Sequence, residues 1–492
     1  MNRWRSGVLV ILGLALLLVP LACQMDWETA RVAHAQTAAQ PAVSQTRFEG
    51  RSGRQVNVLT RWTGPDLESF WAVLRPFIQQ SGVGVSLEAT PNVADILAAR
   101  IEAGALPDVA IVPAGALLQH YVQSGQLVPL SQVLDIAPLA NQYPAGWLEL
   151  GRVAGELYGL PYRAENRSVV WYSPSEFQSR KWAVPATWQE MMALGEQIAN
   201  TGLTPWSLGL RDQTGDGSAG ADWIENILLR LSGPETHDRW VRHEIPWTDE
   251  AVRRAFERWG EIVGRPRQVR GGPLRALKTT CCDAVRELYQ DVPGAYLCLE
   301  GSSIQPLLVR QLQGRRMEED YDFFSLPPMR PQEDAPVLAA ADVVVVFNAT
   351  PQARALVRYL ASREAQVMWV RRGGFIAPSR TVTLADYPDP LSRRAARGVL
   401  EASTLRFAGA DQMPPAVQQA FRQATLEYVL NPSRLEKILR GVEEVAQSAY
   451  EQQPPHAAAV RRSTSTPTPL GRLLEEIAPS LKHWAPLAAP EQ

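Results

Sequence analysis

The sequence predicts an α/β protein with more than one domain. Short β-rich runs alternate with helical patterns between residues 56 and 112, and this alternation favours right-handed βαβ units and a mostly parallel sheet. The chain has 492 residues, which is more than one compact core usually holds. Hydrophobic residues make up 46% and charged residues 20%, the balance of an ordinary globular protein.

The first elements follow one another closely. A β-rich run at residues 56–59 leads to a turn at Trp62, and Pro65 and Asp66 then open a helix, because both residue types suit a first helical turn. In parallel sheets ligands bind where strands end and loops begin. The loop that starts at Trp62 and the loop at residues 113–115 are therefore candidate site segments.

The later chain keeps the mixed pattern. A strand is predicted at residues 168–172, and Thr187 followed by Glu190 resembles a capping box at the start of a helix-rich region. A strongly apolar strand follows at residues 337–347, and Pro351 opens a helix that reaches Trp369. Further strands are expected at 83–87 and 108–112, and helices at 95–103 and through 391–450.

The N-terminus is predicted to be a secretory signal. Basic residues precede an apolar run at residues 8–22, which is too short for a comfortable membrane span. Two cleavage sites are open: a lipoprotein site that makes Cys23 the acylated first residue, with a signal peptide at 1–22, or a site after Ala35, with a signal peptide at 1–35. The first anchors the mature protein at the outer face of the cytoplasmic membrane, and the second makes it periplasmic or extracellular.

Composition excludes several classes of function. The formal net charge of −2 gives no global field that would recruit nucleic acid, so no nucleic-acid partner is expected. The six His residues show no metal-ligand spacing, and the loop at residues 212–217 lacks the alternating acids and the distant Glu of a calcium loop. No metal and no cofactor are therefore expected. The 15 Trp residues fill cores and also suit sugar binding, because indole rings stack on sugar C–H faces.

Cysteine usage leaves two interpretations open. Apart from Cys23 there are Cys281, Cys282 and Cys298, an odd number that leaves at least one thiol unpaired within the chain. One hypothesis is a disulfide from Cys281 or Cys282 to Cys298, with Cys282–Cys298 as the predicted pair. The other is that all three are small core residues.

The order of motifs resembles the extracellular solute-binding proteins of family 1, the receptors of carbohydrate ABC importers, and within them the α-glucoside and maltose binders. The resemblance covers nearly all of residues 56–450. The motifs that carry it are Leu59-Thr60-Arg61-Trp62-Thr63-Gly64, Leu106-Pro107-Asp108-Val109, Gly125-Gln126-Leu127-Val128-Pro129-Leu130, Gly159-Leu160-Pro161-Tyr162, Pro185-Ala186-Thr187-Trp188-Gln189-Glu190, Thr204-Pro205-Trp206, Ala221-Asp222-Trp223-Ile224-Glu225 and Tyr321-Asp322-Phe323-Phe324.

The resemblance implies a periplasmic-binding-protein-like type II fold, in which two α/β lobes are joined by a hinge and hold ligand in the cleft between them. We expect lobe 1 at residues 55–160, returning at about 336–380, and lobe 2 at residues 161–335, continuing at about 381–450. Residues 23–54 are predicted to be a flexible linker, and residues 451–492 a low-complexity C-terminal tail.

The resemblance also implies a set of ligand-binding residues. A neutral sugar needs carboxylates or amides for its hydroxyl pairs and aromatic faces for its C–H surfaces. The candidates are Trp62, Thr63, Ala114 through its backbone, Glu165, Asp222, Trp223, Glu300, Ser302, Phe407, Asp411 and Gln412. No catalytic residue is expected.

Several candidates have a plain structural alternative. Trp62 and Trp223 could be core residues, and Glu165 could form a surface ion pair with a neighbouring Arg. Asp222 and Asp411 could be helix N-caps.

The resemblance implies a receptor that is not an enzyme, that binds a small sugar and that delivers it to ABC transporter permease subunits, with a lipid anchor holding it to the membrane. Three rivals remain. A secreted glycosidase needs only a pair of carboxylates, which Glu165 with Asp222 or Glu300 could supply. A sensory receptor would present the ligand to a signalling partner, and a structural surface protein would use the C-terminal tail for attachment.

Overall fold

The computed structural model describes residues 44–50, 53–212, 217–331 and 333–452. The predicted signal peptide, the lipid-attachment residue Cys23, the cleavage site at Ala35 and nearly all of the predicted tail lie outside these residues. Within them, no helix has both the length and the apolar character that crossing a membrane requires.

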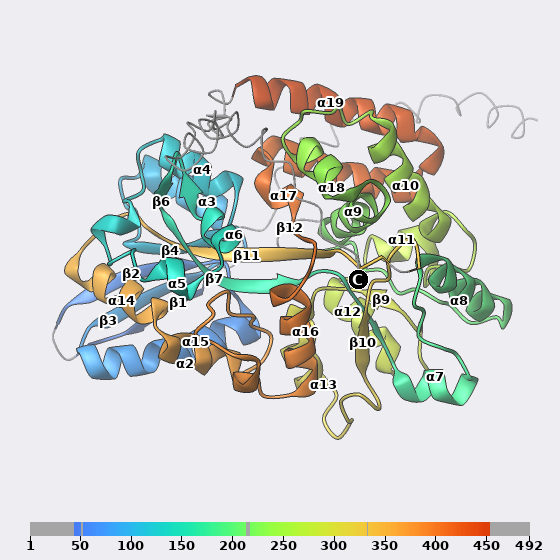
Figure 1. Cartoon of the computed structure of the whole chain (residues 1–492), viewed down its shortest axis with the longest axis horizontal. Coiled ribbons are helices and arrows are strands. Elements are labelled where there is room, and N and C mark those ends of the chain that lie inside the picture. Colours follow the sequence, from blue (N-terminus) through green and yellow to red (C-terminus); the bar gives the residue numbers. More distant parts are fainter. Residues whose placement is uncertain (1–43, 51–52, 213–216, 332, 453–492) are drawn as a thin grey trace, which may run out of the picture.

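A seven-stranded sheet forms the centre of one half of the molecule (Figure 1). Its order is β1-β3-β2-β4-β11-β12, and β7 pairs with β11 beside this path. The central pairs β2–β3 and β2–β4 are parallel, as the βαβ pattern predicts, whereas β11 runs antiparallel to β4 and β7. The strands are β1 (Ser44–Phe48), β2 (Gln55–Thr60), β3 (Gly84–Ala89), β4 (Val109–Pro113), β7 (Gly159–Asn166), β11 (Val337–Val346) and β12 (Leu405–Phe407).

Helices cover both faces of this sheet, which buries its strands on two sides. In Figure 1, α2 and α15 lie below the sheet and α3 and α4 above it. All ten residues of β11 are buried, because neighbours pack against both of its faces and both of its edges. The helices of this half are α2 (Gly64–Ser81), α3 (Val93–Glu102), α4 (Ala116–Gln123), α5 (Leu139–Gln142), α6 (Ala145–Glu149), α14 (Pro351–Ala361), α15 (Arg363–Val370) and α16 (Pro390–Leu400). The hairpin strands β5 (Arg152–Val153) and β6 (Glu156–Leu157) complete it.

The second half is mostly helical around a three-stranded sheet of order β10-β8-β9. The two faces of this sheet pack on different cores, because side chains alternate along a strand. Trp171 and Phe323 join the core of the large sheet, whereas Tyr172 and Phe324 join the core of the helices. The elements are β8 (Val169–Tyr172), β9 (Cys298–Leu299), β10 (Asp322–Ser325), α7 (Pro174–Arg180), α8 (Trp188–Asn200), α9 (Ser218–Val241), α10 (Glu250–Val263), α11 (Gly272–Ala276), α12 (Cys281–Arg286), α13 (Gln305–Gln311), α17 (Gly409–Gln412), α18 (Pro415–Leu430) and α19 (Leu435–Glu451).

The protein therefore has the predicted architecture of two α/β lobes. The chain passes between the lobes after β7, before β11 and after β12. At the first passage the Ser168 hydroxyl accepts from the Leu338 N–H at 2.8 Å and donates to the side-chain amide oxygen Oδ1 of Asn226 at 2.6 Å. One buried side chain thus ties two crossing segments to α9.

Residues 44–48 correct the predicted linker. They form β1, which pairs antiparallel with β3 at the edge of the large sheet. Four of the five residues are exposed, so this edge strand is held mainly by backbone pairing and carries no apolar alternation for sequence reasoning to find. Phe48 packs on Trp71 with a centroid distance of 4.5 Å.

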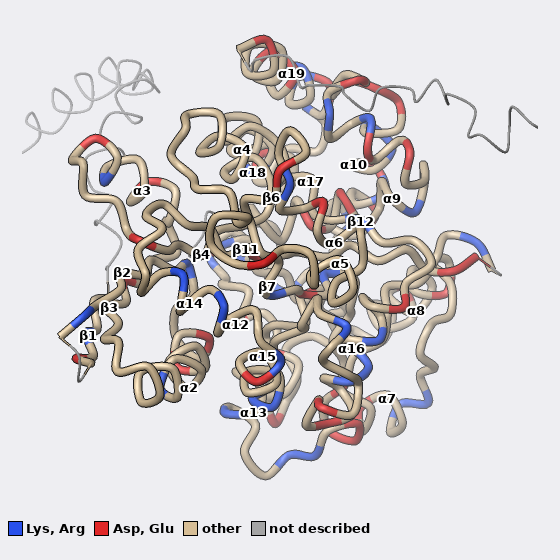
Figure 2. The backbone as a smooth tube through the Cα atoms, turned by 60° about the vertical axis from the view of Figure 1, so that its left-hand side comes forward, with Lys and Arg blue, Asp and Glu red and all other residues tan. Residues whose placement is uncertain are grey.

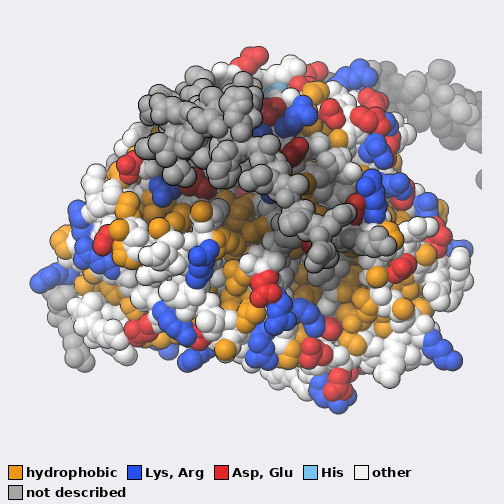
Figure 3. Space-filling model, in the orientation of Figure 1, with side chains coloured by type: hydrophobic (Ala, Val, Ile, Leu, Met, Phe, Trp, Pro, Cys, Tyr) orange, Lys and Arg blue, Asp and Glu red, His pale blue; other side chains and the backbone are white. Residues whose placement is uncertain are grey.

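The surface carries both signs of charge. Figure 2 shows basic and acidic residues interspersed along helices such as α10 and α19, and Figure 3 shows the same mixture over one face. This dispersion agrees with the formal net charge of −2 and with a soluble exterior.

Candidate functional site

A cavity of about 950 Å³ lies where elements of the two lobes face each other. We call it the cleft. The loop between β2 and α2, strand β7 and the middle of β11 contribute one wall, and α9, α12, α17 and α18 contribute the other. Among the described residues that line it are seven acids and five arginines: Asp66, Glu165, Asp212, Asp222, Glu300, Asp342, Asp411, Arg61, Arg163, Arg167, Arg211 and Arg422.

The loop after β2 is fixed by one carboxylate. The Trp62 indole N–H donates to Asp342 Oδ2 at 2.7 Å, and Arg61 Nη1 donates to Asp342 Oδ1 at 3.1 Å. The Trp62 ring packs edge-on against Phe70 and Trp369, and it is only 3% exposed. Trp62 is thus both a core residue and part of the cleft wall, and its contact with ligand stays a prediction.

A second ion pair lies beside it. Arg163 Nη1 contacts Asp66 Oδ2 at 2.6 Å, and the guanidinium sits 5.9 Å from the centroid of the Trp62 ring. Burial raises the pKa of Asp66, and the Arg163 charge opposes that rise. This wall therefore matches each acid with its own arginine.

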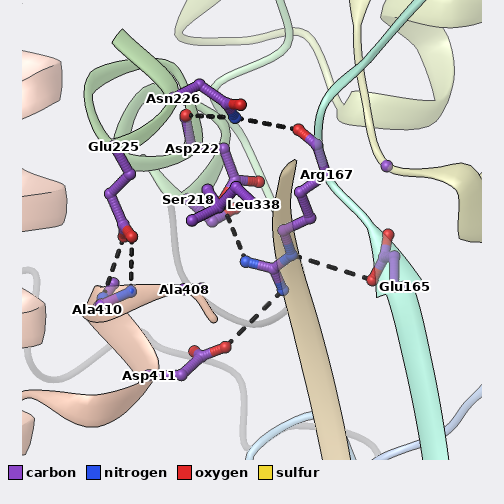
Figure 4. Close-up of polar contacts among 12 residues, drawn as sticks. Glu165, Arg167, Ser218, Asp222, Glu225, Asn226, Leu338, Ala408, Ala410 and Asp411 are labelled. Atoms are coloured by element: carbon purple, nitrogen blue, oxygen red, sulfur yellow. Dashed lines mark hydrogen bonds and ion pairs between the residues drawn. The ribbon is translucent and has the colours of Figure 1, made fainter. Parts of the chain in front are cut away.

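The opposite wall centres on Arg167, which lies between β7 and β8 (Figure 4). Its Nη1 contacts Asp222 Oδ1 at 3.0 Å, whereas Glu165 and Asp411 stand farther away, each at 3.9 Å. Three carboxylates thus share one guanidinium. Burial raises the pKa of Asp222 to about 7, an effect that Glu225 and Glu165 reinforce and Arg167 opposes.

Helix α9 places two acids for two purposes. Asp222 faces the cleft, and one turn later Glu225 accepts from the backbone N–H groups of Gly409 and Ala410, at 2.5 and 3.0 Å (Figure 4). Those two amides open α17, the short helix that carries Asp411. Glu225 is fully buried, so this carboxylate holds the α17 wall against α9.

Two further carboxyl groups complete the site. Glu165 Oε1 accepts from the Ser303 hydroxyl at 2.6 Å, and Glu300 Oε1 accepts from the Gly301 N–H at 3.2 Å. Burial raises the pKa of Glu300 well above its usual range, and the charges of Asp222 and Glu165 add to the rise. A protonated Glu300 can donate a hydrogen bond, whereas an ionised carboxylate only accepts.

Six of the eleven predicted site residues line the cleft: Trp62, Thr63, Glu165, Asp222, Glu300 and Asp411. Glu165 contacts Arg167, the neighbouring-Arg ion pair that the sequence predicts as its structural alternative. This contact lies inside the cleft instead of on the open surface.

The other five predicted residues are not among those that line the cleft. Trp223 follows Asp222 by one residue on a helix, so it turns inward and packs edge-on against Trp206 at 5.2 Å. Phe407 packs on Trp147 at 4.9 Å. The Gln412 side-chain amide donates to the backbone carbonyl of Phe407 at the end of β12.

Ser302 and Ala114 form hydrogen bonds that hold neighbouring backbone segments together. The Ser302 hydroxyl accepts from the Asn166 N–H at 3.1 Å, and the Ala114 N–H donates to the carbonyl of Ala341 at 2.9 Å. Both residues are buried next to the cleft wall that they support.

Sequence reasoning missed the partners of the acids. Arg61, Arg163, Arg167 and Asp342 line the cleft, and none was predicted as a site residue. One signal was present: Asp342 is the single charged residue in the apolar run of β11. A charge in a strand with both faces covered needs a buried partner.

The predicted Cys282–Cys298 disulfide is absent from the structure, in which Cys281, Cys282 and Cys298 are free thiols. Cys298 is buried in β9 in the core of the large sheet, and its thiol donates to the carbonyl of Leu299. Cys281 and Cys282 are half-buried and line the cleft, with their Sγ atoms 3.7 Å apart.

The arrangement suits an uncharged, hydroxyl-rich molecule. Ionised carboxylates accept from hydroxyl groups, guanidinium groups donate to them, and the two charge signs nearly balance. Trp62 is the single aromatic residue among the described residues of the lining, so stacking surface is limited. The described part of the chain contains no cluster of His, Cys, Asp and Glu suited to a metal ion.

Sequence comparison finds relatives over most of the chain. A family profile described as "Bacterial extracellular solute-binding protein" matches residues 72–395. The osmoprotective compounds-binding protein GgtB of Synechocystis sp. is 36% identical over 364 residues, which are 74% of this chain and 86% of that protein. The alpha-glucosides-binding periplasmic protein AglE of Rhizobium meliloti is 33% identical over 371 residues, which are 74% of this chain and 80% of that protein.

Solved structures share the fold. The solute receptor AcbH, described as having an exclusive preference for β-D-galactopyranose, matches with a TM-score of 0.69 and 20% identity over 80% of this chain and 99% of that one. RafE in complex with raffinose matches with a TM-score of 0.65 and 16% identity over 80% of this chain and 99% of that one.

Proposed function

Because this chain belongs to the bacterial extracellular solute-binding protein family, we propose that it is the carbohydrate receptor of an ABC importer. In this role it binds a small neutral α-glucoside in the cleft and delivers it unaltered to the permease subunits. A lipid anchor on Cys23 would keep the receptor at the membrane that holds its transporter. Relatives named for α-glucosides and for osmoprotective compounds support this choice of ligand class.

The observation that carries the proposal is the Arg167 cluster. Asp222 and Asp411 come from the helical lobe and Glu165 from the strand β7 of the other lobe, and all three surround one guanidinium in the cleft. A sugar hydroxyl can replace the two long 3.9 Å contacts with short hydrogen bonds to both lobes. Ligand then favours the closed arrangement, because only that arrangement lets both lobes contact it.

A thermal-shift panel tests the ligand class. Maltose, trehalose, sucrose, glucose, galactose, raffinose and glycerol 3-phosphate are each added to the purified protein, and an α-glucoside is expected to raise Tm because it binds the native state alone. Titration calorimetry then gives Kd for the best sugar. A panel in which no α-glucoside raises Tm would contradict the proposal for this ligand class.

Two controls separate binding from catalysis and from general destabilisation. NMR of the sugar after long incubation should show it unaltered, whereas hydrolysis would favour the glycosidase alternative. The variant Asp222→Asn should weaken binding at least about 10-fold, since it replaces the carboxyl group at the centre of the site with an amide. The matched change Glu257→Gln alters an exposed acid on α10 that pairs with Arg253, and it should leave Kd unchanged.

A further inference from the structure

The cleft wall holds a pair of adjacent thiols that sugar binding does not require. Cys281 and Cys282 open α12, and both line the cleft. Their Sγ atoms are 3.7 Å apart. The third thiol, Cys298, is buried in the core of the large sheet.

The backbone that carries the pair is held in place. The Arg211 N–H donates to the carbonyl of Thr279 at 3.1 Å, and Thr280 caps α12 by accepting from the Asp283 N–H at 3.1 Å. A Cβ atom added at Gly209 would lie 2.4 Å from the Thr280 carbonyl oxygen. The segment with Gly209 and the segment with Thr280 therefore pack backbone against backbone. The two sulfurs therefore stay next to each other and next to the cleft.

We propose that Cys281 and Cys282 form a disulfide with each other in the exported protein, and that this bridge is a part of the cleft wall that contacts the bound solute. The second half of the proposal rests on the proposed function, and the first half does not. An extracytoplasmic compartment favours disulfides, and the chain belongs to a family of extracellular proteins.

The chemistry is a thiol–disulfide exchange with an external disulfide, either a small-molecule disulfide or an exchange protein of the same compartment. The hydrogen bond from the Cys281 thiol lowers the pKa of Cys282, so Cys282 is the first nucleophile. Its thiolate attacks the external S–S bond, forms a mixed disulfide and releases one thiolate. Cys281 then loses its proton and attacks the Cys282 sulfur, which releases the second thiolate. The external disulfide gains two electrons and the two protons.

Chain geometry makes this bridge a reversible one. Adjacent Cα atoms are about 3.8 Å apart, below the roughly 4.4 Å minimum usual for a disulfide, so the bond is strained and easily reduced. The position at the start of a helix limits the free-energy cost of distorting the backbone around the bridge. The N–H groups of a first turn have no acceptor within the helix, so the distortion breaks no helical hydrogen bond that they donate. The closed pair replaces two S–H donors with an apolar edge in a lining that has little apolar stacking surface.

Peptide mapping tests the bridge without any ligand. Trypsin cleaves after Lys278 and Arg286, so residues 279–286 form a peptide whose cysteines are Cys281 and Cys282 alone, and Cys298 falls in the next peptide. The full chain is exported, purified without reductant, denatured and alkylated. We expect the 279–286 peptide to be unalkylated and about 2 Da lighter than its dithiol form, with Cys298 fully alkylated. Two alkylated thiols in that peptide, or a link to Cys298, overturn the proposal.

Titration of the sugar identified by the panel tests the contact with solute. Reductant should weaken binding of the unchanged protein about 10-fold and should leave the double variant Cys281→Ser/Cys282→Ser unaffected, while Cys298→Ser should respond like the unchanged protein. If reductant does not change Kd although the bridge is present, the role in the cleft wall is overturned. If no sugar binds in either redox state, the proposed function fails, and the peptide mass still decides whether the bridge exists.

Discussion

The two walls of the cleft treat buried charge differently. On the β2–α2 wall, Arg163 pairs with Asp66, and Arg61 pairs with Asp342, so acids and arginines match one to one. At the α9–α17 wall, Asp222 and Asp411 share Arg167 with Glu165, which reaches the guanidinium from β7 on the first wall. The matched wall is a finished structure, whereas the shared wall has acceptor capacity left for another donor. This contrast indicates that the shared wall, where carboxylates outnumber guanidinium groups, is the one suited to bind a ligand.

Removal of the shared guanidinium should have the largest effect. We expect Arg167→Met to lower the free energy of unfolding by about 4 kcal/mol, because three partly buried carboxylates lose their counter-charge. Urea unfolding measures this loss, and calorimetry should show no sugar binding. Arg61→Met removes one contact of a matched pair and should cost clearly less; equal costs would erase the distinction between the two walls.

The pH dependence of stability should report the shared wall. The pKa of Asp222 is about 7 in the folded protein against 3.8 in the unfolded chain, so between these values the native state holds the extra proton. Stability then falls as pH rises through this window, by about 4 kcal/mol in all if Asp222 acts alone.

Asp222→Asn should flatten that dependence. Urea unfolding at several pH values between 4 and 8 compares the variant with the unchanged protein. Asp342→Asn on the matched wall is the control and should leave the slope in place. An unchanged slope in Asp222→Asn would mean that another group holds the proton.

The Glu225 anchor should act on binding through α17. In Glu225→Gln one backbone amide of α17 faces an NH₂ group, and we expect a loss of about 2 kcal/mol in stability together with weaker sugar binding. Glu443 offers a matched control, because its carboxylate accepts from the Trp247 N–H at 2.7 Å elsewhere in the same lobe. Glu443→Gln should lower stability and leave Kd unchanged; a similar loss of affinity in both variants would argue against a positioning role for Glu225.

The indole hydrogen bond of the matched wall should give the smallest effect. Trp62→Phe removes the donor to Asp342 and should cost about 1.5 kcal/mol beyond the loss of ring volume. Trp240→Phe isolates the volume effect, because the Trp240 indole N–H is buried without a hydrogen-bond partner. The difference between the two variants in their loss of stability, measured by thermal unfolding, gives the contribution of the hydrogen bond. Equal losses would show that the Trp62 indole donates no stabilising hydrogen bond to Asp342.

Much of the architecture followed from sequence periodicity and from the resemblance. The predicted strand at residues 108–112 is β4 (Val109–Pro113), and the predicted helix at residues 95–103 is α3 (Val93–Glu102). The predicted capping box also forms in part, since Thr187 accepts from the Glu190 N–H, but Glu190 reaches back to Ala186 instead of to the N-cap residue. These features depend on residues close in sequence, where local rules apply.

The site was less predictable, because its contacts join distant segments. Arg61 and Asp342 are 281 residues apart, and Arg167 and Asp222 are 55 apart. Local patterns show that a loop carries an arginine, but they do not show which acid will face it once the lobes are assembled. Trp223 illustrates the same limit, since one residue of helical rotation separates a cleft side chain from a core side chain.

Ser168 joins two crossing segments to α9, and Arg167 is its neighbour in the chain. When two rigid arms swing about a pivot, the groups beside the pivot travel least. If the lobes turn about this bond, the Arg167–Asp222 ion pair keeps its shape whether the receptor is empty or loaded, while the longer contacts from Arg167 to Glu165 and Asp411 change as the lobes turn. The deepest part of the recognition surface would then be preformed before the solute binds. Rotation of the lobes would determine how tightly the entrance closes over it.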